Sequence, residues 1–179
     1  MCKTRPLETR PLETIAVYKE ARVKVYGITE KDGLVLITLS FPANQMQQWG
    51  RRVALLEEHT KRFELITYHA ANKKRTELHL LFAHTLSISL QETLEKWVKT
   101  DQQSTFQLRQ PVDIFYLHGP HFQDRFGIAD IAFNALKQKG IAILVSGCAG
   151  TSMYLVTPAN QGATTLRLLT ETFLIPTSV

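Results

Sequence analysis

The chain has 179 residues, of which 44% are hydrophobic and 21% are charged, and this balance is typical of a globular protein with a buried core. Its only two cysteines, Cys2 and Cys148, exclude a disulfide framework and a metal cluster built on thiolates. No stretch approaches the roughly 20 consecutive apolar residues of a membrane helix, and the N-terminus lacks the apolar core of a secretory signal. We therefore expect a cytoplasmic protein.

The formal net charge of +5 raises the question of an anionic partner. The basic residues gather in three short groups: Arg51-Arg52, Lys61-Arg62 and Lys73-Lys74-Arg75. These groups fall on a predicted helix face, a helix end and a hairpin tip, where basic residues are ordinarily solvated, and they form no long stripe. We expect neither a nucleic acid nor a membrane as partner.

Residues 1–21 contain the segment Arg-Pro-Leu-Glu-Thr twice in tandem. Each copy carries a proline, which removes a backbone donor and favours an extended conformation in the residue before it. These residues are predicted to form an extended arm or a linker.

The apolar pattern of the first half predicts two leading strands and then the order helix, strand, strand, helix, with a closing strand. The strands are expected within 15–28 and at 34–41, 63–71, 76–82 and 105–108, and the helices at about 44–61 and from residue 89 onward. A turn is expected at 30–33, and the polar segment 72–75 is predicted to be a hairpin tip.

The second half repeats this order without obvious identity at the level of residues. Strands are expected at 112–118, 141–145 and 153–156, and helices at 128–139 and from Thr157 onward. Two successive units of strand, helix, strand, strand, helix predict an α+β fold made of two ferredoxin-like (βαββαβ) units, each an antiparallel sheet with helices on one face.

Residues 118–144 resemble the ACT repeat at the C-terminus of aspartokinases. The motif has a glycine after the first strand, then Gly-Ile-Ala, a Phe, Ala-Leu and Gly-Ile-x-Ile. Here it is met by Gly119, Gly127-Ile128-Ala129, Phe133, Ala135-Leu136, Gly140-Ile141 and Ile143. Residues 25–39 are similar to the segment that leads into the first repeat, and the whole resemblance covers about residues 22–175. The second repeat is the specific part, and the first is degenerate.

This resemblance implies a regulatory region without a kinase domain: a first ACT module at 22–110 and a second at 111–179. In such proteins the first repeat is inserted into the second, so that strand 23–28 would complete the second sheet and the two modules would interlock. The implied function is the binding of an amino acid, or a similar small molecule, with allosteric transmission through a homodimer or a partner enzyme of amino-acid biosynthesis. No cofactor, metal or catalytic residue is expected.

The ligand of an ACT module is expected where the loop after the first strand meets the first helix, because the first backbone N–H groups of a helix are free to bind a carboxylate. In the second module this indicates the segment Asp124, Arg125, Phe126, Gly127, Ile128 and Ala129, together with Ser146 on the second strand. The backbone of 127–129 would bind the carboxylate, Asp124 the ammonium group, and Arg125 an anionic group instead. The alternative is that Gly127 only permits a tight turn and Asp124 only caps the helix.

The first module departs from the family pattern, with Asn44-Gln45-Met46 in the place of the usual Asp-x-Pro-Gly loop, and these residues form a weaker candidate site. Other motifs have simpler explanations. The segment 147–152 lacks the lysine of a phosphate-binding loop and is predicted to be a hairpin turn. His118 and His121 have the spacing of metal ligands but no evident third ligand in the sequence.

Two other hypotheses remain open from the sequence. The chain could be a ligand-free dimerisation or interaction module, including a detached regulatory subunit of an aspartokinase. It could also be an enzyme, although no paired carboxylates and no nucleophile with a matching base are evident.

Overall fold

The computed structural model describes residues 22–56, 63–83, 88–120, 122 and 126–176. The described elements, in chain order, are β1 (Gly27–Pro42), η1 (Ala43–Gln45), α1 (Met46–Leu55), β2 (Phe63–Ala70), β3 (Arg75–Phe82), α2 (Ile88–Asp101), β4 (Thr105–His118), α3 (Ile128–Lys137), β5 (Val145–Ala149), β6 (Ser152–Pro158), η3 (Ala159–Gln161) and α4 (Gly162–Thr172). The predicted arm or linker, 1–21, lies outside the described residues.

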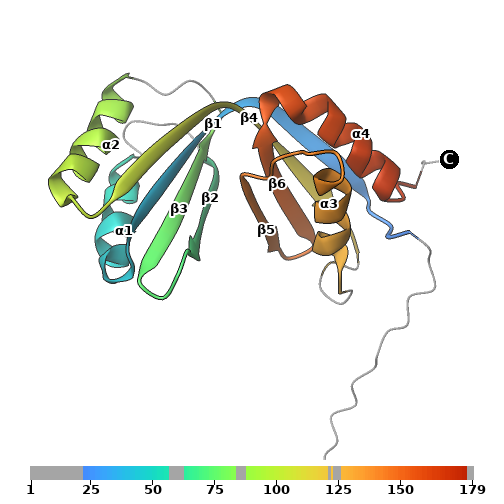
Figure 1. Ribbon diagram of the computed structural model, residues 1–179, viewed down its shortest axis with the longest axis horizontal. Helices are drawn as coiled ribbons and strands as arrows, with labels where there is room; N and C mark the ends of the chain where they lie inside the picture. The colour runs from blue at the N-terminus through green and yellow to red at the C-terminus, as the bar shows by residue number, and fades with distance from the viewer. Residues whose placement is uncertain (1–21, 57–62, 84–87, 121, 123–125, 177–179) are drawn as a thin grey trace, which may run out of the picture.

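All six strands belong to one sheet, in the order β2-β3-β1-β4-β6-β5, and every neighbouring pair is antiparallel. The α+β fold with antiparallel pairing, predicted from the sequence, is therefore confirmed. The sheet curls, so that α1 and α2 cover its outer face on one side of the molecule and α3 and α4 cover it on the other (Figure 1). We call the part with β2, β3, α1 and α2 the first half, and the part with β5, β6, α3 and α4 the second half.

The two long central strands, β1 and β4, pass through both halves (Figure 1). The start of β1, Gly27–Lys31, pairs with the end of β4, Ile114–His118, whereas Leu36–Ser40 pairs with Thr105–Arg109. Each half thereby has four neighbouring strand segments in ferredoxin-like order. The sequence prediction of separate strands with a turn at 30–33 was wrong, because that segment is a bulge within a continuous strand.

Register shifts in the β1–β4 pairing, between Lys31 and Leu36, change which side chains face the helices. The inner face is the side of the sheet that the helices do not cover. In the first half Gln107 and Arg109 of β4 line a hollow on this face, and in the second half Val112 and Ile114 of β4 belong to a core cluster on the same face. The bulge therefore keeps apolar residues directed at helices in both halves of a single sheet.

Three apolar clusters form the core, two under the helix pairs and one between the inner faces of the two halves. In the first half Trp49 of α1 is fully buried and stacks on Phe41 of β1, with ring centroids 5.3 Å apart. In the second half Ile128, Ala132 and Leu136 of α3 pack on the sheet, as their spacing predicted. The inner cluster consists of Leu34, Leu36, Leu81, Val112, Ile114, Val145, Tyr154 and Val156.

The segment before β1, residues 22–26, is bound to the segment that follows α4. Val25 N–H donates to Leu174 O at 3.0 Å, and Leu174 N–H donates to Val23 O at 2.9 Å. The guanidinium of Arg22 donates to the backbone carbonyl oxygens of Phe173, at 2.6 Å, and of Thr170, at 3.3 Å. Cations are favourable at a helix C-terminus, so Arg22 stabilises the end of α4.

A four-residue segment, Pro-Ala-Asn-Gln, occurs at 42–45 and again at 158–161. Both copies begin at a proline with nearly the same backbone angles, φ −57° and ψ 136° at Pro42 and φ −60° and ψ 138° at Pro158, and both form a short 3-10 turn that leads into a helix. The repeated sequence thus builds the same strand-to-helix connection before α1 and before α4.

None of the helices in the described part of the chain is both long and apolar enough to cross a membrane.

Candidate functional site

The start of α3 lies after the end of β4, as the sequence indicated. Gly127 precedes the helix with φ +84°, a left-handed conformation that favours glycine, and no side chain caps the helix there. Ile131 N–H donates to Gly127 O at 3.0 Å, which closes the first turn. The N–H groups of the residues before it have no partner within the helix, and they provide donors for an anion at this point.

The structure brings part of the predicted ligand site together at this helix start. Ile128 is buried, so its side chain belongs to the core and it offers a ligand only its backbone, while Ala129 is partly buried against the same cluster. Phe126 is 99% exposed and contacts no core. Asp124 and Arg125 lie outside the described residues.

Ser146 is exposed on β5, directly opposite Leu155 of β6. Leu155 belongs to the core under α3 and α4, so Ser146 is on the helix-covered side of the edge strand. Within the described residues no hydrogen bond joins Ser146 to the start of α3. Its role in a shared site remains a prediction.

The corresponding turn of the first half is occupied by structural contacts. Gln45 Nε2 donates to Asp101 Oδ1 at 2.8 Å, which ties the start of α1 to the end of α2, and Met46 packs against the core. Burial alone would raise the pKa of Asp101, but hydrogen bonds from Ser104 and Gln45 outweigh it and hold that pKa below its usual value. Asn44 is exposed in the 3-10 turn.

A hollow of about 470 Å³ lies between β2 of the first half and β5 and β6 of the second. Tyr154 of β6 crosses this space, and its hydroxyl donates to Thr67 Oγ1 of β2 at 2.9 Å. A Cβ at Gly147 would lie 2.2 Å from the Tyr154 hydroxyl oxygen, so only glycine lets the ring lie across β5. Sequence reasoning missed this bridge, because it depends on the pairing of Gly147 with Tyr154 in the β5–β6 hairpin. That hairpin confirms the turn predicted at 147–152.

Carboxylates gather near the start of α4, on the second half. Asp113 is buried, and its Oδ1 accepts a hydrogen bond of 3.1 Å from Gly33 N–H. Burial first, and then the charge of Asp32, raises the pKa of Asp113 above its usual value. Burial and the charges of Asp113 and Asp32 likewise raise the pKa of Glu30.

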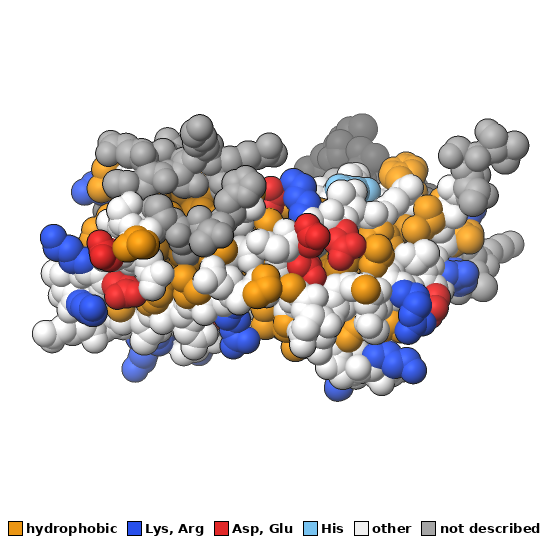
Figure 2. Space-filling view, turned by 90° about the horizontal axis from the view of Figure 1, so that it is seen from above, with side chains coloured by type: hydrophobic (Ala, Val, Ile, Leu, Met, Phe, Trp, Pro, Cys, Tyr) orange, Lys and Arg blue, Asp and Glu red, His pale blue; other side chains and the backbone are white. Residues whose placement is uncertain are grey.

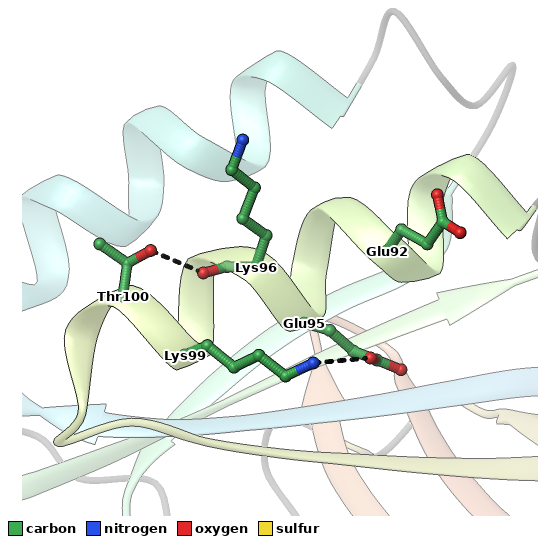
Figure 3. A pocket seen from close by; sticks show the side chains of 5 residues that line it. All are labelled: Glu92, Glu95, Lys96, Lys99 and Thr100. Atoms are coloured by element: carbon green, nitrogen blue, oxygen red, sulfur yellow. Dashed lines mark hydrogen bonds and ion pairs between the residues drawn. The ribbon is translucent and has the colours of Figure 1, made fainter.

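A further hollow lies beside α2, and the described residues that line it all belong to that helix (Figure 3). Lys99 Nζ lies 3.6 Å from Glu95 Oε2, one helical turn away, and Thr100 Oγ1 donates to Lys96 O at 2.8 Å. Such pairs are typical of a solvated helix face, and the polar groups do not converge on one point (Figure 3). The described side chains around this hollow therefore offer no binding geometry.

Of the two histidines with metal-ligand spacing, His118 and His121, the structure describes His118. His118 Nδ1 lies 2.7 Å from Ser152 Oγ, and its ring stacks on Tyr116, whereas His121 lies outside the described residues. Cys148 is exposed with a free thiol on β5, in the same hairpin.

Solved structures show what this arrangement is similar to. The regulatory subunit of aspartate kinase from Thermus thermophilus, in a ligand-free form, matches with a TM-score of 0.70 and 16% identity, over 84% of this chain and 99% of that one. Aspartate kinase from Synechocystis matches with a TM-score of 0.71 and 16% identity, over 92% of this chain and 30% of that one. E. coli aspartokinase III, in complex with lysine and aspartate, matches with a TM-score of 0.59 and 15% identity, over 88% and 35%.

This chain has the fold of an aspartate kinase regulatory domain. The resemblance found in residues 118–144 is therefore confirmed at the level of the fold. The match with the Thermus thermophilus regulatory subunit extends over nearly the whole of that subunit, whereas this chain spans only about a third of the two enzymes. No protein-family model and no curated protein matches the sequence.

The surface of this regulatory-domain fold shows no basic stripe on the face seen in Figure 2. Blue side chains are scattered along that face, and acidic side chains gather near its middle. A continuous basic surface is the usual mark of nucleic-acid binding, so this face offers no support for it.

Proposed function

We propose that this chain is a non-catalytic regulatory module that binds an amino acid, or a similar small molecule, and passes the effect of binding to a partner enzyme. The observation that carries this proposal is the fold shared with a regulatory subunit of aspartate kinase over 99% of that subunit. We further propose that it works as two ACT modules, 22–110 and 111–179, with the N-terminal strand segment completing the second.

The proposed ligand site is the start of α3. Gly127 presents the first backbone N–H groups of the helix, and the buried side chains of Ile128 and Ala132 hold those groups in place against the sheet. A carboxylate suits this position because it carries the negative charge that a helix N-terminus favours. Asp124 would receive the ammonium group, and Ser146 would add a side-chain hydrogen bond. The complex of E. coli aspartokinase III with lysine and aspartate makes amino acids the first ligands to examine.

Calorimetric titration of the full chain with the standard amino acids tests this proposal. We expect one or a few of them to bind, and Asp124→Asn to weaken that binding by about 10- to 100-fold, because a hydrogen bond to a charged group contributes about 1.5–3 kcal/mol. Asp130→Asn is the matched control: Asp130 is an exposed carboxylate in the first turn of the same helix, and its loss should leave binding unchanged. If none of the standard amino acids binds, the proposal is contradicted.

A homodimer is the expected route of transmission. Among the described strands β2 and β5 form the two edges of the sheet, and an edge strand can offer backbone groups to another strand. Edge strand β2 also exposes two large apolar side chains, Ile66 and Tyr68, at 46% and 65%. Light scattering during gel filtration should report twice the mass of the chain, and Ile66→Lys should shift it to the mass of one chain.

The alternative is a ligand-free interaction module, such as a detached regulatory subunit of an aspartokinase. The end-to-end match with the Thermus thermophilus regulatory subunit favours this candidate as well. Affinity purification of the tagged chain from its own cells distinguishes the two. If the chain binds none of the amino acids but a kinase co-purifies with it, the alternative is supported.

A further inference from the structure

Three potential metal ligands converge on the inner face of the β2–β3 hairpin. His69 of β2 lies directly opposite Glu77 of β3, and His79 is two residues further along β3, so all three side chains share one face of the sheet. Leu78 and Leu80, between and beyond them, pack into the helix-covered core, which places the three on the opposite, inner side. One ligand atom from each of the three side chains lies within 4.8 Å of the other two.

The spacings between these atoms are close to those that a metal ion requires. His79 Nε2 lies 3.3 Å from His69 Nδ1 and 3.9 Å from Glu77 Oε2, and His69 Nε2 lies 3.3 Å from Glu77 Oε2. Bonds of about 2.0–2.2 Å from a tetrahedral zinc ion hold its ligand atoms about 3.4 Å apart. The two contacts of His69 come from different ring nitrogens, so binding to one ion requires the exposed His69 ring to turn until one of these nitrogens faces the common centre.

A neighbouring strand orients the buried histidine. His79 Nδ1 lies 3.0 Å from Thr38 Oγ1 of β1, and the ring is only 4% exposed. When Nδ1 donates its proton to this hydroxyl, Nε2 keeps its lone pair and faces Glu77 and His69. Metal-binding histidines are typically held by such a hydrogen bond on the other ring nitrogen.

We propose that His69, Glu77 and His79 bind a divalent transition-metal ion, Zn²⁺ in the first place, in the space between the two halves. Two imidazole nitrogens and one carboxylate suit zinc and its neighbours and do not suit Mg²⁺ or Ca²⁺, which prefer oxygen ligands. One hollow is lined by His69 and another by Glu77 and His79. A water molecule could reach the fourth coordination position of the metal through them. The metal would tie β2 to β3 beside the Tyr154–Thr67 bridge between the halves.

The test is a metal titration of the full chain after treatment with a chelator. We expect Zn²⁺ to bind at one ion per chain and to raise the melting temperature, and Co²⁺ to give the visible absorption of nitrogen and oxygen ligands without a thiolate band. His69→Gln should weaken binding by at least about tenfold. Its side chain is 54% exposed, so the variant is expected to fold, which circular dichroism checks. Thr38→Val should weaken binding about tenfold through the orientation of His79 alone.

His118→Gln is the matched control, because His118 is paired with Ser152 on another strand and should not affect the metal. Cys148→Ser should likewise leave binding unchanged. Binding that survives His69→Gln, or that disappears in either control, would overturn the proposal, as would the absence of any binding at micromolar Zn²⁺. None of these outcomes depends on whether the chain binds an amino acid.

Discussion

The two halves of this molecule share one strand order but differ at the start of their first helices. In the first half the turn before α1 is held by the Gln45–Asp101 hydrogen bond, and Trp49 fills the core one turn later. In the second half Gly127 opens α3 in a left-handed conformation, with an exposed Phe126 beside it. Neither helix start has a side-chain cap. On the proposed function, the start of α3 is open to a ligand, whereas the side chains at the start of α1 make internal contacts.

Removal of the Trp49 side chain should have the largest effect on this comparison. Trp49 is fully buried between Phe41 and the guanidinium of Arg52, which lies 4.6 Å from its ring. Trp49→Ala should lower the free energy of unfolding by about 3–5 kcal/mol, because it leaves a large cavity in the first half. Urea denaturation measures this change. A loss below about 1 kcal/mol would contradict the view that the start of α1 is occupied by structural packing.

Substitution of Gly147 should have a smaller effect, located between the halves. In Gly147→Ala the new Cβ would collide with the ring and hydroxyl of Tyr154, so the ring must move and release Thr67. The expected loss is about 1–3 kcal/mol, measured by urea denaturation. Gly50→Ala is the control: a Cβ there meets nothing within 4 Å, and alanine in place of glycine in a helix stabilises by about 0.5–1 kcal/mol. Equal effects at both positions would exclude the close approach of Tyr154.

The smallest expected effects concern the pH dependence of stability at two carboxylates, Asp101 of the first half and Asp113 of the second. Hydrogen bonds lower the pKa of Asp101 in the folded protein, so its charge adds stability at every pH above the pKa of the unfolded chain. This stability is lost as the pH falls from the unfolded pKa through the lower, folded one. Burial raises the pKa of Asp113, so its ionisation costs stability as the pH rises from the usual aspartate pKa through the raised one.

Melting temperatures at pH 4 and pH 7.5 test the sign of both effects. At pH 7.5 Asp101→Asn should be less stable than the parent and Asp113→Asn more stable, because an asparagine oxygen can still accept the Gly33 hydrogen bond. The Asp113 difference should shrink at pH 4, whereas the Asp101 difference should shrink only when the pH falls below the usual aspartate pKa. Opposite signs at pH 7.5 would show that the environments of these carboxylates are assigned wrongly.

The sequence predicted much of this architecture because local patterns decide most of it. The helix face of Ile128, Ala132 and Leu136 and the hairpin tip at 72–75 follow from short-range spacing and turn chemistry, and the structure confirms both. The continuity of β1 and β4 was missed, since Gly33 and Pro111 resemble strand ends and only the long-range pairing shows otherwise.

The sites were harder to predict for the same reason. The three proposed metal ligands come together only through the register of β2 with β3: His69, Glu77 and His79. A search for ligands at a fixed sequence spacing does not find them. The start of α3 could be named because a motif places glycine before an apolar helix face. The position of Ser146 relative to that helix depends on the sheet and could not be derived from its place in the chain.

Backbone NMR during titration with an amino acid identified by calorimetry tests the central claim most directly. We predict that the amide signals of Gly127, Ile128 and Ala129 shift in proportion to the bound fraction, while those of Met46 and Gln47 at the start of α1 stay in place. Shifts centred on α1 instead, or none at either helix start, would contradict the account.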